Sequence, residues 1–345
     1  MDRRDFLLLA AQTAAAAPTA RIRAAIYGTQ HSHAIGKLQA MLNNADYEVA
    51  GVCEPDSEAR RQRQDERVWR DLKFLTEEQV LGDATIHLVV VECKVWQAIP
   101  RGRKVIAAGK HLHLEKPPAA GMAPFRELVE EARRKKLLLQ MGYIWRFHQG
   151  FAAAIEAARN GWLGEVYMAR WTINTDIAQP LREDNARYKG GILFELAGHM
   201  IDRVVDLWGR PKAVRTWLRH DTGVPDKLAD NTLAVFEYDR SLAVISSAAR
   251  MPNHSEHRVF ELIGTDGAIV LQPVEPCTRM RISMREPRGP YRAGWQEVEF
   301  PPQPRYIRDF QELARALKSG QPLKFSYDHE LLLHETLLRA SSEQA

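Results

Sequence analysis

Hydrophobic and polar positions in the first part of the chain predict strands and helices in strict alternation. Short apolar runs are separated by stretches in which apolar residues recur every three or four positions. The run Ile86–Val91 is apolar apart from His87 and rich in valine, as expected of a strand buried on both faces. Strands are predicted at Ile22–Tyr27, Tyr47–Cys53, Leu72–Leu75, Ile86–Val91, His111–Leu114 and Leu137–Gly142, and helices at 33–42, from Ser57, at 97–108 and at 124–135. This order predicts an α/β fold with an open, doubly wound parallel sheet.

The pattern changes after Trp145. A helix (150–160) and a strand (166–173) lead into a polar loop (179–191) and then an amphipathic helix (192–208). Short strand-like runs with hairpin turns between them follow at 213–219, 232–238, 242–247, 259–264, 268–271, 280–284 and 295–300. They predict a large, mostly antiparallel open sheet with a helix against one face. Two further helices are predicted at 306–318 and 328–341.

The length of 345 residues suits two domains. We divide the chain into an expected export-signal segment 1–20, a nucleotide-binding domain 21–145, a second α+β domain 146–325 for substrate binding and oligomerisation, and a C-terminal helix 326–345. The net charge of +4 is spread along the chain, so the composition does not favour nucleic-acid binding. Three widely spaced cysteines argue against a disulfide framework and against a cysteine-based zinc site.

The N-terminus has the composition of an export signal. Arg3 and Arg4 precede Phe6-Leu7 and a short apolar, alanine-rich stretch that ends near Ala20. The paired arginines resemble a signal of the twin-arginine type, and the apolar run is too short to span a bilayer. We expect a periplasmic or secreted protein, or a cytoplasmic one if this segment is not a signal. No membrane association beyond export is expected.

The loop after the first strand reads Gly28-Thr29-Gln30-His31-Ser32-His33. A dinucleotide-binding loop has three spaced glycines, and here Gln30 and His33 take the second and third positions. The loop still opens a helix, whose N-terminus favours an anion. Glu54 ends the second strand, where an acid accepts a ribose hydroxyl and repels a 2′-phosphate, which favours NAD over NADP. An ordinary α/β turn with a solvated glutamate is the alternative.

Lys116 follows a predicted strand, at the edge where open parallel sheets bind their ligands. A lysine there can hold a substrate oxygen or transfer a proton. The helix 192–208 carries Glu195, His199 and Asp202 at spacings of four and three, so these side chains share one face. Such a stripe suits acid–base chemistry or, alternatively, a metal. The close pairs His31/His33, His111/His113 and His254/His257 have no acidic or cysteine partner nearby in the sequence, and we expect no metal site.

Several short motifs together resemble the glucose–fructose oxidoreductase / inositol dehydrogenase (Gfo/Idh/MocA) family over nearly the whole chain after the signal. They are Glu115-Lys116-Pro117, Met141-Gly142-Tyr143 with Arg146-Phe147, Gly161-x-Leu163-Gly164, Gly190-Gly191, Gly198-His199-x-x-Asp202 and Asp230-Asn231-Thr232. The resemblance implies a Rossmann domain, a C-terminal domain with a large open sheet, NAD(P), and a sugar or polyol substrate. It also implies a homo-oligomer, a dimer or tetramer formed through the open face of that sheet.

The resemblance carries residue roles with it. It implies that Lys116 and His199 polarise the substrate and transfer its proton, with Glu195 beside them. Our candidate cofactor-binding residues are Gly28, Gln30, His31, Glu54, Glu92, Glu115 and Lys116. Our candidate substrate-binding residues are Arg146, Arg187 and Asp202.

The chain departs from the family pattern in three places. The glycine loop is altered, Glu195 replaces the usual aspartate, and Glu92-Cys93-Lys94 replaces a Thr-Pro-Asn segment. The leading hypothesis is an NAD-dependent oxidoreductase acting on a sugar, polyol or glycoside. Because free NAD is scarce outside the cytoplasm, an exported enzyme would keep its cofactor and favour a redox-neutral reaction, such as transient oxidation followed by elimination, hydrolysis or epimerisation. The alternative is a degenerate relative that binds a carbohydrate or a partner without turnover.

Overall fold

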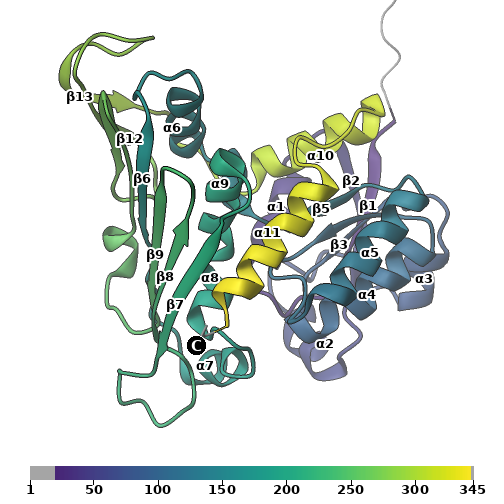
Figure 1. Ribbon diagram of the computed structural model, residues 1–345. Coiled ribbons are helices and arrows are strands. Elements are labelled where there is room, and N and C mark those ends of the chain that lie inside the picture. Colours follow the sequence, from purple (N-terminus) through teal and green to yellow (C-terminus); the bar gives the residue numbers. More distant parts are fainter. Residues whose placement is uncertain (1–19, 343–345) are drawn as a thin grey trace, which may run out of the picture.

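The computed structural model describes residues 20–342, and its first domain is built on a five-stranded parallel sheet. The strands are β1 (Ile22–Tyr27), β2 (Tyr47–Cys53), β3 (Leu88–Val91), β4 (His111–Leu114) and β5 (Leu139–Met141), in the order β2-β1-β3-β4-β5. Helix α1 (Ala34–Leu42) packs on one face, and α4 (Val95–Ala107) and α5 (Met122–Arg134) pack on the other (Figure 1). The predicted doubly wound parallel sheet is confirmed.

Local sequence explains where these elements begin. All four residues of β3 are buried, which matches its continuous apolar run. Asp56 accepts hydrogen bonds from two backbone N–H groups at the start of α2 (Ser57–Gln64), and Thr76 forms a capping box with Gln79 at the start of α3 (Glu77–Gly82). The prediction of a strand at 72–75 is wrong. Only one isolated bridge, between Phe74 and Val52, forms there, because the chain leaves the sheet edge to enter α3.

The second domain is an eight-stranded sheet with helices on one face. Its strands are β6 (Val166–Thr172), β7 (Ala213–Arg219), β8 (Asn231–Glu237), β9 (Leu242–Ala248), β10 (Val259–Gly264), β11 (Gly267–Leu271), β12 (Arg279–Met284) and β13 (Gly294–Glu299). The order is β13-β12-β11-β10-β6-β9-β8-β7, and every pair is antiparallel except β6 with β9. Helix α6 (Gln149–Arg159) lies on the face of this sheet that the helices cover, which we call the inner face (Figure 1). The predicted large, mostly antiparallel sheet is confirmed.

Two predictions about the inner face need correction. The segment 179–191 is not all loop, because α7 (Gln179–Asn185) forms there with Pro180 in its first turn. The predicted helix 192–208 is two helices, α8 (Ile192–Leu196) and α9 (Gly198–Trp208), which meet at Ala197. A Cβ on Gly198 would lie 2.9 Å from the Tyr143 ring, so glycine lets α9 start against that ring.

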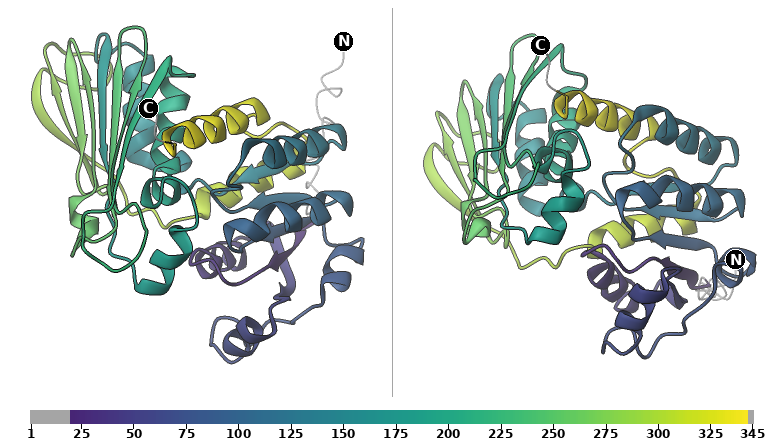
Figure 2. Two further views of the ribbon diagram at one scale, coloured as in Figure 1. Left: turned by 60° about the horizontal axis from the view of Figure 1, so that its bottom comes forward. Right: turned by 90° about the horizontal axis from the view of Figure 1, so that it is seen from below.

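The C-terminal helices connect the two domains. Helix α10 (Ile307–Ser319) packs beside α1 on the first domain, where Phe310 and Leu313 join its core. Helix α11 (Tyr327–Ala340) lies between α5 of the first domain and α9 of the second (Figure 1, Figure 2). One apolar core runs from the parallel sheet through Tyr143 and Trp145 to the large sheet. Within residues 20–342, no helix is long and apolar enough to cross a membrane.

Candidate active site between the two domains

The three residues predicted to be catalytic line a single cavity of about 160 Å³ between the domains. Lys116 follows β4, Glu195 is on α8 and His199 is on α9. The Lys116 ammonium donates to Glu195 Oε1 at 2.7 Å and to the Glu195 carbonyl oxygen at 2.9 Å. The break between α8 and α9 therefore places a carboxylate and an imidazole beside the same lysine.

His199 is buried and has no hydrogen-bond partner for Nδ1 among the described residues. The rings of Tyr143 and Trp145 pack against it, with centroids 5.9 and 5.5 Å away. Burial, together with the nearby charge of Lys116, lowers the pKa of His199 well below its usual value. The imidazole is consequently neutral at physiological pH, the form that accepts a proton.

The β1–α1 loop has the backbone that a dinucleotide needs, although it lacks two of the usual glycines. Gly28 has φ +104°, and a Cβ there would lie 2.4 Å from the Glu92 carbonyl oxygen. No side chain caps the first turn of α1, so its N-terminus is available to an anion. Thr29 donates from its backbone N–H and its hydroxyl to Glu54 Oε2, at 2.7 and 2.8 Å. The backbone of the loop is therefore compatible with a dinucleotide, and the hydrogen bonds from Thr29 to Glu54 hold the loop in place.

A buried lysine that the sequence analysis did not single out neutralises the acids beside this loop. Lys37 on α1 donates to Glu92 Oε1 at 2.6 Å and also to Glu115 Oε2. Burial alone would lower the pKa of Lys37, but Glu115 and Glu92 raise it above its usual value. The signal was present in the sequence, since Lys37 falls in the stripe of α1 that also buries Ala34 and Leu38.

The two loop histidines face Glu115, although none of the sequence around them suggested an acidic partner. His33 Nδ1 lies 3.1 Å from Glu115 Oε2, and His31 Nδ1 lies 3.7 Å from the same oxygen. The argument that these histidines lack an acidic partner is therefore wrong. Glu115 comes from the end of β4, eighty-two residues beyond His33, and local spacing could not reveal the contact.

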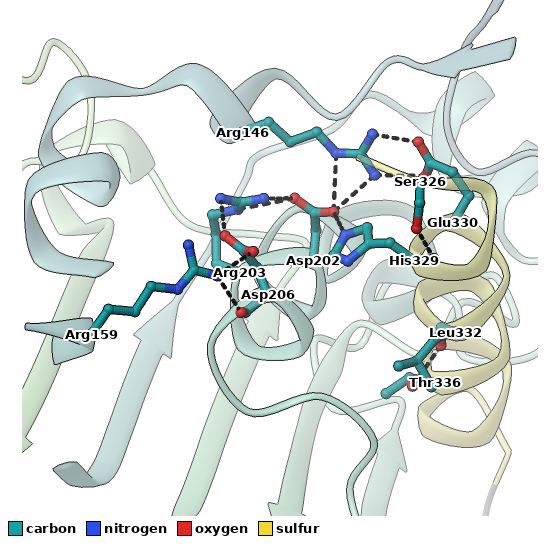
Figure 3. Close-up of polar contacts among 10 residues, drawn as sticks. All are labelled: Arg146, Arg159, Asp202, Arg203, Asp206, Ser326, His329, Glu330, Leu332 and Thr336. Atoms are coloured by element: carbon teal, nitrogen blue, oxygen red, sulfur yellow. Dashed lines mark hydrogen bonds and ion pairs between the residues drawn. The ribbon is translucent and has the colours of Figure 1, made fainter. Parts of the chain in front are cut away.

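Two of the predicted substrate-binding residues, Arg146 and Asp202, bond to each other outside the cavity (Figure 3). Asp202 Oδ1 accepts from Arg146 at 2.9 and 3.0 Å and lies 2.8 Å from His329 Nε2, and Asp202 Oδ2 accepts from Arg203. Arg146 also bonds Glu330 on α11. Both side chains are fully engaged in this buried ion cluster, so they hold elements together instead of facing a ligand.

The third, Arg187, is exposed and lines a different hollow, beside Tyr188 and Ser342. Residues that the sequence analysis did not assign complete the main cavity. Arg305 donates to Glu275 Oε1 at 2.7 Å, and Arg258 lies 3.5 Å from the same carboxylate. The polar cavity lining outside the predicted residues consists of Ser32, His33, Thr175, Asn185, Arg258, Glu275 and Arg305.

A doubly wound nucleotide-binding domain, a lysine at the end of a parallel strand and a sheet domain that closes over it define a class of two-domain oxidoreductases. A family model described as "Oxidoreductase family, NAD-binding Rossmann fold" matches residues 22–143. A model described as "GFO/IDH/MocA C-terminal domain" matches residues 151–270. Together the two models match more than two thirds of the chain, which belongs to the Gfo/Idh/MocA family.

Individual relatives are distant. An uncharacterised oxidoreductase of Schizosaccharomyces pombe is 28% identical over 60% of this chain and 57% of its own length. The myo-inositol 2-dehydrogenase of Thermotoga maritima is 24% identical over 62% of this chain and 64% of its own length. The matched region thus spans less than two thirds of either protein. An oxidoreductase from Agrobacterium radiobacter, solved with NAD⁺, L-tartaric acid and magnesium, has a TM-score of 0.76 at 15% identity, covering 92% of this chain and 94% of that one. That similarity concerns the fold.

Proposed function

We propose that the protein is an NAD-dependent oxidoreductase that acts on a hydroxyl group of a sugar, polyol or glycoside. The observation that carries this proposal is the meeting of Lys116, Glu195 and His199 in one cavity at the carboxyl end of the parallel sheet. Open α/β sheets bind ligands at that edge. The inositol dehydrogenase among the relatives supports the substrate class.

The chain's own residues have distinct parts in this reaction. NAD, held by the loop at Gly28 and by Glu54, supplies the hydride acceptor. Lys116 donates a hydrogen bond to the substrate oxygen, and Glu195 keeps its ammonium in place. His199 is neutral and takes the hydroxyl proton as general base. The surrounding tryptophan and tyrosine rings exclude water from that transfer.

The N-terminal sequence supports export, which would make the reaction redox-neutral. The twin-arginine-type segment lies outside the described residues, except for Ala20, and rests on the sequence alone. An exported enzyme folds around its NAD before leaving the cytoplasm and must regenerate it in every turnover. Transient oxidation of a sugar carbon, followed by elimination, hydrolysis or epimerisation and then reduction, satisfies that requirement.

The outer face of the large sheet supports a homo-oligomer. The helices cover only one face of this sheet, and near the β7 edge the other face presents Leu233, Val235 and Val244. These side chains are only partly exposed, but they lie side by side across β8 and β9. An apolar patch of this kind marks an interface between proteins. We propose that two copies pair through it.

The test begins with the purified full chain. Denaturation should release bound NAD(H), and the protein should convert at least one member of a panel of inositols, sugar acids and glycosides. Lys116→Ala should lower kcat at least a hundredfold with an unchanged circular dichroism spectrum, whereas Lys104→Ala, an exposed lysine of α4, should have no effect. A protein that never retains NAD(H), even after soaking, would instead be a non-catalytic binding relative, which the altered glycine loop favours.

A further inference from the structure

Two histidines and a glutamate converge where the β1–α1 loop approaches the end of β4. One nitrogen of His31, one nitrogen of His33 and one oxygen of Glu115 all lie within 4.8 Å of one another. The two Nδ1 atoms are 3.7 and 3.1 Å from Glu115 Oε2. Ligands bonded to Zn²⁺ at about 2.0–2.2 Å are roughly 3.3–3.6 Å apart in a tetrahedral site. The spacing of the three groups therefore suits one metal ion.

A fourth group, independent of these three, points to the same place. Glu92 is fully buried, and its Oε2 has no hydrogen-bond partner among the described residues. That oxygen is 3.8 Å from His31 Nδ1, which is too far for a hydrogen bond but close enough for both atoms to bind the same metal ion. Burying a carboxylate oxygen without a partner is unfavourable, and a cation at this point would satisfy it.

Both imidazoles could supply a nitrogen to a metal in exchange for their present hydrogen bonds. His31 Nδ1 accepts a hydrogen bond from the backbone N–H of His33 at 3.2 Å, so it carries no proton, and a metal ion would take this lone pair in exchange for that contact. Neutral imidazole nitrogens with carboxylate oxygens are the ligand set of zinc and neighbouring first-row metals.

The Lys37 ammonium bonds Glu92 Oε1 and Glu115 Oε2 and leaves the second oxygen of Glu92 open to a cation. Lys37 donates to Glu92 Oε1 at 2.6 Å and not to Oε2, the oxygen that has no hydrogen-bond partner among the described residues. Lys37 would continue to anchor both acids from the α1 side with the ion bound.

We propose that His31, His33 and Glu115, assisted by Glu92, bind one divalent first-row transition-metal ion, with Zn²⁺ as the probe of choice. His33 also lines the cavity with Lys116, so the ion lies at the cavity wall, and water or a substrate oxygen completes its coordination. The proposal reassigns His31, Glu92 and Glu115 from cofactor contacts to metal ligands. Its test is separate from that of the oxidoreductase function, because metal binding is measured without dinucleotide or substrate.

The test measures metal binding by the chelator-treated full chain, without dinucleotide or substrate. Titration with Zn²⁺ should give one saturable site per chain, and Co²⁺ should give the absorption bands of a four- or five-coordinate ion. His31→Gln and His33→Gln should each weaken Zn²⁺ binding at least tenfold. His87→Gln is the matched control, since His87 is an exposed histidine of the same domain, and it should bind as the wild type does.

X-ray absorption of the zinc-loaded wild type tests the ligand set without any substitution, so the result does not depend on whether a variant folds. It should show two imidazole nitrogens at about 2.0 Å with carboxylate oxygens in the first shell. The proposal is overturned if the wild type has no saturable site, if it binds no better than the His31→Gln/His33→Gln double variant, or if the spectrum lacks imidazole. If the protein binds the metal but never retains NAD(H), the oxidoreductase proposal is contradicted and the metal proposal is not.

Discussion

Three glutamates each follow a strand of the parallel sheet, Glu54 after β2, Glu92 after β3 and Glu115 after β4, and their hydrogen-bond partners differ. Glu54 accepts from Thr29 and lies 3.8 Å from Arg101, whereas Glu92 and Glu115 share Lys37. Buried carboxylates require partners of this kind. A further negative charge beside Glu54 would therefore be unfavourable, whereas the N-terminus of α1 remains open to an anion.

This charge distribution predicts a preference for NAD over NADP. The 2′-phosphate of NADP would add about two negative charges near Glu54, while the ribose hydroxyl of NAD adds none. We expect the wild type to bind NAD at least tenfold more tightly than NADP, as measured by calorimetric titration of both. Glu54→Gln keeps an oxygen acceptor for Thr29 but removes the charge, and it should narrow the preference mainly by improving NADP binding.

Glu58→Gln serves as the control, because Glu58 is an exposed residue of α2 just beyond the same strand. If Glu58→Gln narrows the preference as much as Glu54→Gln does, general surface charge rather than Glu54 sets the cofactor choice. Equal wild-type affinity for both dinucleotides would contradict the prediction outright.

At the scale of elements, the ion cluster around Asp202 connects the 3₁₀ helix Ile144–Phe147, α9 and α11 (Figure 3). Removing one partner from a buried ion pair leaves the other charge without compensation, which costs about 3–5 kcal/mol. Asp202→Asn should therefore lower the free energy of unfolding by about 3 kcal/mol or more. Urea unfolding followed by fluorescence measures this change.

Asp206 provides a matched comparison on the same helix. It pairs with Arg203 at 3.0 Å and with Arg159 at 2.7 Å, but its side chain is 16% exposed and partly solvated. Asp206→Asn should cost about 1 kcal/mol or less. Equal losses for the two variants would show that burial does not set the strength of the Asp202 contacts.

The buried His334 of α11 should make the free energy of unfolding depend on pH. Burial lowers the pKa of His334 to about 4, while in the unfolded chain the pKa is near 6.5. Between these values the unfolded state binds more protons, so stability falls as the pH decreases from about 6.5 to about 4. The loss from this residue is about 3 kcal/mol. His334→Gln should lose correspondingly less stability over that pH range, as measured by urea unfolding at several pH values. A variant with the wild-type pH dependence would contradict the prediction.

Elements buried on one or both faces were predictable, and contacts between distant segments were not. Strand β3 and the helices α10 and α11 have local patterns of apolar residues, and these patterns can be recognised without knowing any contact with distant segments. The break at Ala197 leaves none, because apolar residues continue through it. The contact of His33 with Glu115 depends on the parallel sheet bringing two strand ends together. Lys37 lay within reach of sequence reasoning, since a lysine in a buried stripe requires acidic partners.

For the whole molecule, the shared core leaves one large surface without a covering layer. Helices fill the space between the two sheets, and α11 contacts both domains, so the inner face of the large sheet is closed. The outer face carries the apolar pairs Trp217–Leu233 and Val235–Val244 across β7, β8 and β9. Such a face on an eight-stranded sheet is large enough to bury a standard protein–protein interface.

We therefore expect the wild type to be a dimer or a larger even-numbered oligomer by light scattering after size exclusion. Val235→Lys places a charge in the apolar patch on β8 and β9, where burial against a second copy would be unfavourable, and it should yield monomers with an unchanged circular dichroism spectrum. Leu42→Lys alters an exposed leucine on α1 of the first domain and should leave the oligomer intact. Because the β1–α1 loop and Glu54 belong to the first domain, away from the outer face of the large sheet, monomers should still bind NAD. A wild type that is monomeric at tens of micromolar, or a Val235→Lys variant that remains oligomeric, would place the interface elsewhere or exclude it.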